Sequence, residues 1–358
     1  MPLPLSDPGR RARVIATIAA CAALCTIDRS AVVPLGAAPQ TAGAASDAAS
    51  DATSNATSPG GLEVLEVRPN FFVIAGAGGN IGVQVGEDGV VVVDAGSTAR
   101  ASAVVAAIKR ITPKPIRYVI DTGPDADHVG GNEALSQAGE TLFPSNRIGG
   151  QQRDFTGPVA AILATEGVLQ RMTAAGSTPA YAAGAWPTET FHYARKYMFM
   201  NGEAIEVLHQ PAAHSDSDAI VFFRRSDVVM AGDVLDARQF PVIDVDRGGS
   251  IQGEIAALDR LSELAVPSGP IVSREAGTIV VPGHGRLYDQ YDVIEYRDMV
   301  AIIRDRVRDL IAAGRSLEAV KAAGPAKGYA GRYGNAGGAW TTDRFVEAVY
   351  RSLVKEKP

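Results

Sequence analysis

Residues 121–132 read DTGPDADHVGGN and form the most informative segment of the chain. They follow a short run whose composition is typical of a β-strand. Three carboxylates and one histidine lie within eight residues of this loop, at Asp121, Asp125, Asp127 and His128. Like charges so close together repel one another, and a bound divalent cation is the simplest compensation. The alternative is a solvated acidic loop in which an aspartate caps a following helix, and the loop alone does not decide between the two.

Three further segments place metal-binding side chains at the ends of expected strands. His214 lies in a loop between two expected strands, Asp233 comes just after an apolar strand, and His284 lies in a tight Pro-Gly-His-Gly turn after the last expected strand. Strand ends on a rigid scaffold are common positions for binding and catalytic residues. Each segment alone is a weak signal, but in this order and separation they form a specific one.

The pattern resembles the metallo-β-lactamase superfamily over residues 62–288. That family carries a Thr-His-x-His-x-Asp-His loop, then a lone histidine, a Gly-Asp position and a Gly-His turn. The resemblance implies that the chain has a set of matching metal ligands, namely Asp127, His128, His214, Asp233 and His284. It also implies that Asp94, which ends a run of four valines, is the structural aspartate of the family.

Two positions of the loop depart from the family pattern. Gly123 stands where the family has its first histidine, and Asp125 stands where it has the second. The first metal site therefore keeps His214, with Asp125 as a substitute ligand and Asp233 as a bridge. The second site, formed by Asp127, His128, Asp233 and His284, is complete. We expect one tightly bound metal ion with a weaker second, while full occupancy of two sites and no useful metal remain open alternatives.

The resemblance implies hydrolysis by a metal-activated water that Asp127 orients. Zinc is the expected metal, and manganese or iron also suits a site rich in carboxylates. The expected substrate is a small molecule with an ester, lactone, amide or β-lactam-like bond. Two alternatives remain: a catalytically impaired metal- or ligand-binding protein of the same fold, and an iron-dependent oxygenase of the same fold. The net charge of −6 argues against a nucleic-acid partner, and nothing in the sequence sets the oligomeric state.

Strand and helix patterns predict an α+β fold, a four-layer αββα sandwich over residues 62–290. Residues 291–358 are expected to form a C-terminal helical extension packed on this domain. Residues 159–174 are expected to be helical.

The N-terminal region reads as a targeting segment. Three arginines precede a short apolar run at residues 14–24, so residues 1–38 are a predicted signal peptide and the protein is expected to be periplasmic or secreted. The apolar run is too short for a membrane span, although a lipid anchor at Cys21 is an open alternative. Residues 39–61 are small and polar and are expected to be a flexible linker. Both cysteines, Cys21 and Cys25, lie in the targeting segment, so the metal site must be built from His, Asp and Glu.

Overall fold

The computed structural model describes residues 56–58, 61–142, 159–177, 179–268 and 277–355. The predicted signal peptide, Cys21 and most of the predicted linker lie outside the described residues. Within that linker, residues 56–58 form strand β1 (Ala56–Ser58), which pairs antiparallel with β2. Among the described helices, none is both long enough and apolar enough to cross a membrane.

The first sheet contains eight strands in sequence order. They are β1, β2 (Leu62–Arg68), β3 (Phe71–Ala75), β4 (Ile81–Gly86), β5 (Gly89–Val93), β6 (Ile116–Ile120), β7 (Ala161–Thr165) and β8 (Glu189–Phe191). Strands β1 to β5 pair antiparallel, and β5 to β8 pair parallel. All five residues of β5 are buried, as its unbroken apolar sequence predicts for a strand covered on both faces.

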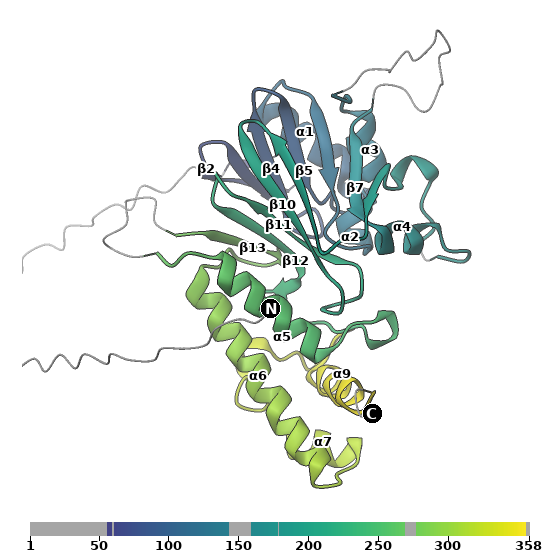
Figure 1. The fold of residues 1–358 in the computed structure, drawn as a ribbon, viewed down its shortest axis with the longest axis vertical. Helices are drawn as coiled ribbons and strands as arrows, with labels where there is room; N and C mark the ends of the chain where they lie inside the picture. Colours follow the sequence, from purple (N-terminus) through teal and green to yellow (C-terminus); the bar gives the residue numbers. More distant parts are fainter. Residues whose placement is uncertain (1–55, 59–60, 143–158, 178, 269–276, 356–358) are drawn as a thin grey trace, which may run out of the picture. The chain divides into compact units, whose positions relative to one another are not determined.

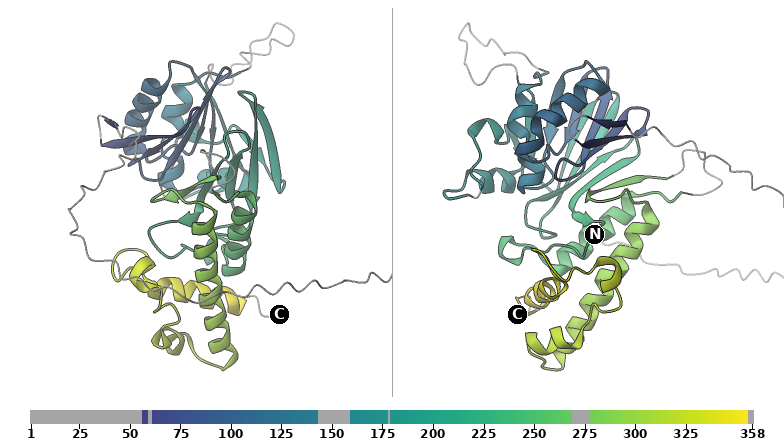
Figure 2. Two further views of the ribbon diagram at one scale, coloured as in Figure 1. Left: turned by 90° about the vertical axis from the view of Figure 1, so that its left-hand side faces the viewer. Right: turned by 180° about the vertical axis from the view of Figure 1, so that it is seen from behind.

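The second sheet contains five strands in the order β13-β12-β11-β10-β9. They are β9 (Arg195–Met200), β10 (Glu203–Gln210), β11 (Asp218–Phe223), β12 (Val228–Asp236) and β13 (Ile279–His284). Pairing is antiparallel except between β12 and β13. Figures 1 and 2 show the two sheets face to face.

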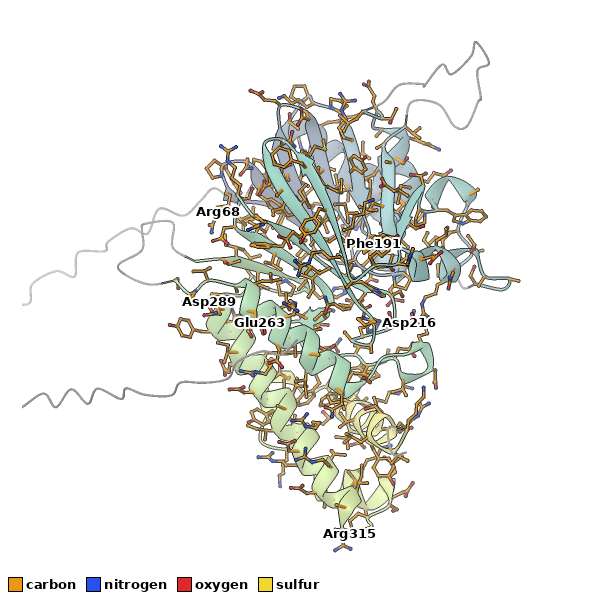
Figure 3. All side chains as sticks on the ribbon, in the orientation of Figure 1. Arg68, Phe191, Asp216, Glu263, Asp289 and Arg315 are labelled. Atoms are coloured by element: carbon orange, nitrogen blue, oxygen red, sulfur yellow. The ribbon has the colours of Figure 1, made fainter. Side chains whose placement is uncertain are left out.

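Apolar side chains from both sheets fill the space between them. Phe71 of β3 and Phe223 of β11 meet edge to face at 4.8 Å between ring centroids, and Phe191, labelled in Figure 3, joins them from β8. Each such side chain contributes roughly 1.5–3 kcal/mol to stability when fully buried. Helices α1 (Ala101–Ile111) and α3 (Asn132–Gln137) cover the outer face of the first sheet.

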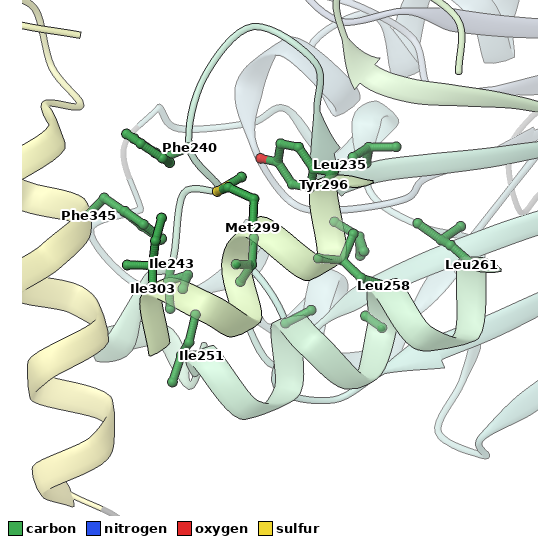
Figure 4. Packing of buried hydrophobic residues seen from close by; sticks show 14 of the residues in the cluster. Leu235, Phe240, Ile243, Ile251, Leu258, Leu261, Tyr296, Met299, Ile303 and Phe345 are labelled. Atoms are coloured by element: carbon green, nitrogen blue, oxygen red, sulfur yellow. The ribbon is translucent and has the colours of Figure 1, made fainter. Parts of the chain in front are cut away.

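A second group of helices packs together next to the second sheet, and its first helix lies on β12 (Figure 1). These helices are α5 (Ile251–Leu264), α6 (Gln290–Ala312), α7 (Leu317–Ala323), α8 (Ala330–Tyr333) and α9 (Thr342–Lys355). Ser250 caps α5 by accepting a hydrogen bond from the Gly253 N–H, as serine commonly does at the N-terminus of a helix. Figure 4 shows how Phe345 of α9 packs close to Phe240 and Ile243, which belong to the loop after β12. The predicted αββα sandwich with additional C-terminal helices is confirmed.

One predicted element was wrong in part. Residues 159–174 were expected to be helical throughout, but they form strand β7 followed by the short helix α4 (Glu166–Thr173). Four of the five residues of β7 are buried, and a short, continuous apolar run of this kind has the same hydrophobic pattern as a buried helical segment. Parallel pairing with β6 decides in favour of the strand.

Candidate metal centre

The six predicted ligands converge at one end of the two sheets. Asp125, Asp127 and His128 follow β6 and lie at the N-terminus of α2 (Ala126–Val129) or within it. His214 lies in the loop after β10, Asp233 lies on β12, and His284 is the last residue of β13. They form two groups whose ligand atoms lie within 4.8 Å of one another, Asp127 with His128 and His284, and Asp125 with His214 and Asp233. Asp127 and His284, which lie 157 positions apart in the sequence, thus meet as the motif predicted, although the role of these residues as ligands stays a prediction.

Two glycines bring the β3–β4 turn against the acidic loop. A Cβ atom on Gly78, whose φ is +120°, would lie 2.8 Å from the Asp127 Cβ, and one on Gly79 would lie 3.3 Å from a ring carbon of His128. Only glycine allows so close an approach. The glycine-rich turn therefore serves to pack the loop that carries Asp127 and His128.

Asp94 orients the His128 ring. The Asp94 carboxylate, buried and held at a φ of +63°, accepts hydrogen bonds from the Thr122 N–H at 2.8 Å and from the Thr122 hydroxyl. Its Oδ2 lies 2.8 Å from His128 Nδ1, and because an ionised carboxylate only accepts, Nδ1 carries the proton. A carboxylate that holds a histidine in this way is a common partner of metal-ligating imidazole.

The other ring nitrogen of His128 fits a metal ligand. Its Nε2 is completely buried and makes no hydrogen bond of acceptable geometry with any described residue. It lies 3.1 Å from Asp233 Oδ1, which in turn lies 3.5 Å from His284 Nε2. A buried nitrogen without a hydrogen bond is costly, and a metal ion among these atoms would satisfy it. The residues present therefore fit a metal ion at the second site.

An irregular strand presents Asp233. The pairing of β12 with β13 shifts register after Met230 and again after Gly232, where φ is +54°. Bulges of this kind re-aim side chains near functional sites. Asp127 completes this side of the centre, with its Oδ2 3.0 Å from His284 Nε2.

The other group is arranged differently. The ring of His214 donates Nδ1–H to the Val242 carbonyl at 2.8 Å, so its Nε2 faces Asp125 Oδ2 at 2.9 Å. The second oxygen of Asp125 accepts a hydrogen bond from Arg247 Nη1 at 2.8 Å. Gly123 lies beside open space, since a Cβ on it would meet only an Asp218 oxygen at 3.9 Å.

Positive and negative groups alternate through the centre. Burial alone would raise the pKa of Asp233, but His128 and the other two imidazoles hold it below its usual range. Burial alone would lower the pKa of His128, yet Asp233 and Asp94 raise it well above its usual range. Without a metal ion, protons on His128 and His214, whose pKa values are both raised, balance the carboxylates. A divalent cation would displace those protons, as metal binding to histidine generally does.

Two residues of the centre were not found from the sequence. Arg247 ends η3 (Val245–Arg247), and nothing in its local sequence marks it, because its partner Asp125 lies 122 residues earlier. Tyr181 has a buried hydroxyl without a hydrogen-bond partner among the described residues, and burial, followed by the charges of Asp125 and Asp127, raises its pKa to about 12. Its position between two groups of small residues gave no signal.

The two remaining histidines lie outside the ligand groups. His192 is exposed beside Tyr193, and His209 of β10 contacts the backbone oxygen of Asp216 at 2.8 Å. Asp216, labelled in Figure 3, also pairs with Arg171. Neither histidine is brought to the metal centre.

Comparison with known proteins agrees with this arrangement. Residues 75–141 match the family model described as Metallo-beta-lactamase superfamily. No curated protein sequence matches the chain.

Solved structures with the same fold include the stereoselective inverting sec-alkylsulfatase Pisa1 from Pseudomonas sp., with 14% identity, a TM-score of 0.54 and coverage of 82% of this chain. A double mutant of that sulfatase gives 13% identity and a TM-score of 0.57, again over 82% of this chain. The chain spans only 50% of the length of either sulfatase structure. A metallo-beta-lactamase from Pontibacter korlensis matches at 17% identity and a TM-score of 0.48, over 67% of this chain and 99% of that one. At such identities the likeness to the sulfatase concerns the fold alone.

Proposed function

We propose that this chain, which belongs to the metallo-β-lactamase superfamily, is a hydrolase that works with one divalent metal ion. The proposed ligands are Asp127, His128, Asp233 and His284. The observation that carries the proposal is the orientation of His128: Asp94 holds the ring through Nδ1 and leaves the buried Nε2 3.1 Å from Asp233 Oδ1, without a hydrogen bond of acceptable geometry. Such a ring is prepared for a metal ion rather than for a structural hydrogen bond. Zinc suits two imidazoles and two carboxylates, and manganese or iron would also be accepted.

The chemistry divides between the ion and the side chains around it. A divalent ion bound there would acidify a water molecule and polarise the bond to be cleaved. Asp127 has an accessible carboxylate, with 38% of the side chain exposed, and its bond with His284 holds its pKa below the usual range. It is therefore ionised at neutral pH and able to orient a water molecule and accept its proton. Tyr181 keeps its proton at neutral pH and can donate a hydrogen bond.

The proposed substrate is a small molecule with an ester, lactone, amide or β-lactam-like bond. The similarity to an alkylsulfatase adds sulfate esters to the compounds worth testing. The substitutions at Gly123 and Asp125 argue against an efficient β-lactamase, because that side of the centre lacks two imidazole ligands.

The test is turnover by the full-length protein with zinc, on one chromogenic compound from each of these classes. Asp127→Ala should lower kcat by about 10²- to 10⁴-fold, the usual contribution of a positioned acid–base group, and His284→Ala should also remove bound zinc. His192→Ala is the matched control, because this histidine is exposed and makes no contact with the centre. Rates near wild type in both site variants would refute the proposal.

We also propose that the protein is exported, on the basis of the arginines and apolar run at its N-terminus. Expression of the full chain in a Gram-negative host, followed by fractionation, tests this. The proposal expects a shortened protein in the periplasm or medium, and membrane retention that Cys21→Ser abolishes would identify the lipid-anchored form. Full-length protein in the cytoplasm would contradict export.

A further inference from the structure

The first metal position of the family would have to be built on His214 with help from Asp125. Both oxygens of Asp125 are already engaged, Oδ1 by Arg247 and Oδ2 by His214. Gly123 offers no ligand and leaves open space instead. Asp125, His214 and Asp233 still bring three potential ligand atoms within 4.8 Å of one another. Because Arg247 already holds one oxygen of Asp125, and because Gly123 supplies no imidazole, this position fits a metal ion less well than the second site.

Arg247 is held firmly in place. Its Nε lies 2.5 Å from Asp244 Oδ2, and its backbone N–H donates to the other oxygen of Asp244 at 3.0 Å. Its carbonyl accepts a hydrogen bond from Arg171 Nη2 at 2.8 Å. The next residue, Gly248, turns the chain with a φ of +87°, where a Cβ would lie 2.9 Å from the Asp216 Cβ. These contacts fix the backbone at Arg247, and Asp244 holds its guanidinium, so the side chain loses little further freedom when it binds Asp125.

The C-terminal helices support the same loop. Phe345 of α9 stacks on Phe240 with a centroid separation of 4.8 Å and an angle of 4° between the rings. Arg351 of α9 pairs with Asp246, which directly precedes Arg247. The loop also supplies the Val242 carbonyl that orients His214. One segment thus positions both partners of Asp125.

We infer that Arg247 is a positioning residue that takes the place of the first metal ion, which makes the centre mononuclear; this inference rests on the proposed function. A guanidinium is always charged and presents fixed donors that match a carboxylate. It neutralises Asp125 and keeps that carboxylate turned toward His214. Asp233 is thereby left to the metal ion that it would share with His128.

The test counts tightly bound zinc ions by elemental analysis of the full-length protein after dialysis against metal-free buffer. Wild type and Arg247→Lys, which keeps the charge, should each bind one equivalent. The double variant Gly123→His with Arg247→Ala frees Asp125 and supplies the missing imidazole, so it should bind two. Arg260→Ala is the matched control, because it removes an exposed arginine that pairs with Glu263 and takes no part in holding Arg247 or Asp125, and it should bind one equivalent.

Each outcome separates the two claims. The role of Arg247 would be overturned if wild type bound two equivalents of zinc, or if a double variant with an unchanged circular dichroism spectrum bound only one. Either result would leave the hydrolase proposal intact. If the double variant fails to fold, Arg247→Ala alone is titrated with zinc by calorimetry. A second binding event that wild type lacks would support the inference, and a single binding event would overturn it. No zinc in any of the proteins would overturn the proposed function itself, and this inference with it.

Discussion

Replacing Asp94 by asparagine tests how the centre is oriented. The substitution keeps the shape of the side chain, and asparagine also tolerates the φ of +63° found at this position. An amide oxygen can still accept the hydrogen bond from the Thr122 N–H. The amide nitrogen would then face His128 Nδ1, and since both groups would be donors, the imidazole must move its proton to Nε2 or turn away.

The expected loss follows from the geometry. With the proton on Nε2, His128 has no lone pair to offer a metal ion on the side of Asp233. Loss of an orienting carboxylate typically weakens metal binding about 10- to 100-fold, which corresponds to about 1.4–2.8 kcal/mol. One hydrogen bond to a charged group is also lost, so the metal-free protein should be destabilised by about 1.5–3 kcal/mol.

Competition between the protein and a chromophoric zinc chelator measures the zinc affinity. Urea unfolding measures the stability of the metal-free protein. Asp227→Asn is a close control: Asp227 also has a positive φ, of 55°, and accepts a threonine hydrogen bond, from Thr278 at 2.7 Å, but it has no contact with the centre. Zinc affinity should fall in the Asp94 variant alone. Unchanged affinity in that variant, or an equal fall in both, would refute the reasoning.

Three further predictions concern the surroundings of the centre. Burial raises the pKa of Glu254 well above its ordinary value of 4.5, so the native protein keeps a proton that the unfolded chain releases. The stability that this group contributes therefore falls as the pH rises from 4.5 toward the raised pKa, and Glu254→Gln should gain about 1.4 kcal/mol per pH unit over wild type in that range. Urea unfolding of both proteins at several pH values measures this difference, and a difference that does not change with pH would contradict the prediction. Phe345→Ala should cost about 3–5 kcal/mol and speed hydrogen exchange in the loop that carries Val242, and protection equal to wild type would contradict the support attributed to α9. Tyr181→Phe removes a buried hydroxyl that has no hydrogen-bond partner among the described residues, so this variant should have a higher thermal stability and a lower kcat/KM than wild type. A lower thermal stability would contradict this, because it would show that the hydroxyl has a structural partner.

Much of the fold could be predicted because its pattern is local. The fully apolar run before Asp94 forms the buried strand β5. One exception was β7, whose five residues match a buried strand or a helical turn equally well. Its identity depends on pairing with β6, which no local pattern contains.

The candidate site was predictable where side chains follow strands in a familiar order. His128, Asp233 and His284 were identified in this way, and they lie within contact of one another. Arg247 was not identified, because an arginine in a loop has no spacing that distinguishes it from a solvated charge. Only the fold shows that it ends beside Asp125, where the family pattern leads one to expect a metal ligand.

The most direct test of the central claim is anomalous diffraction at the zinc absorption edge from crystals of the zinc-loaded protein. The account predicts one strong peak, bound by Asp127, His128, Asp233 and His284, with Arg247 still paired with Asp125. A peak between His214 and Asp125, or no peak at the four predicted ligands, would contradict it.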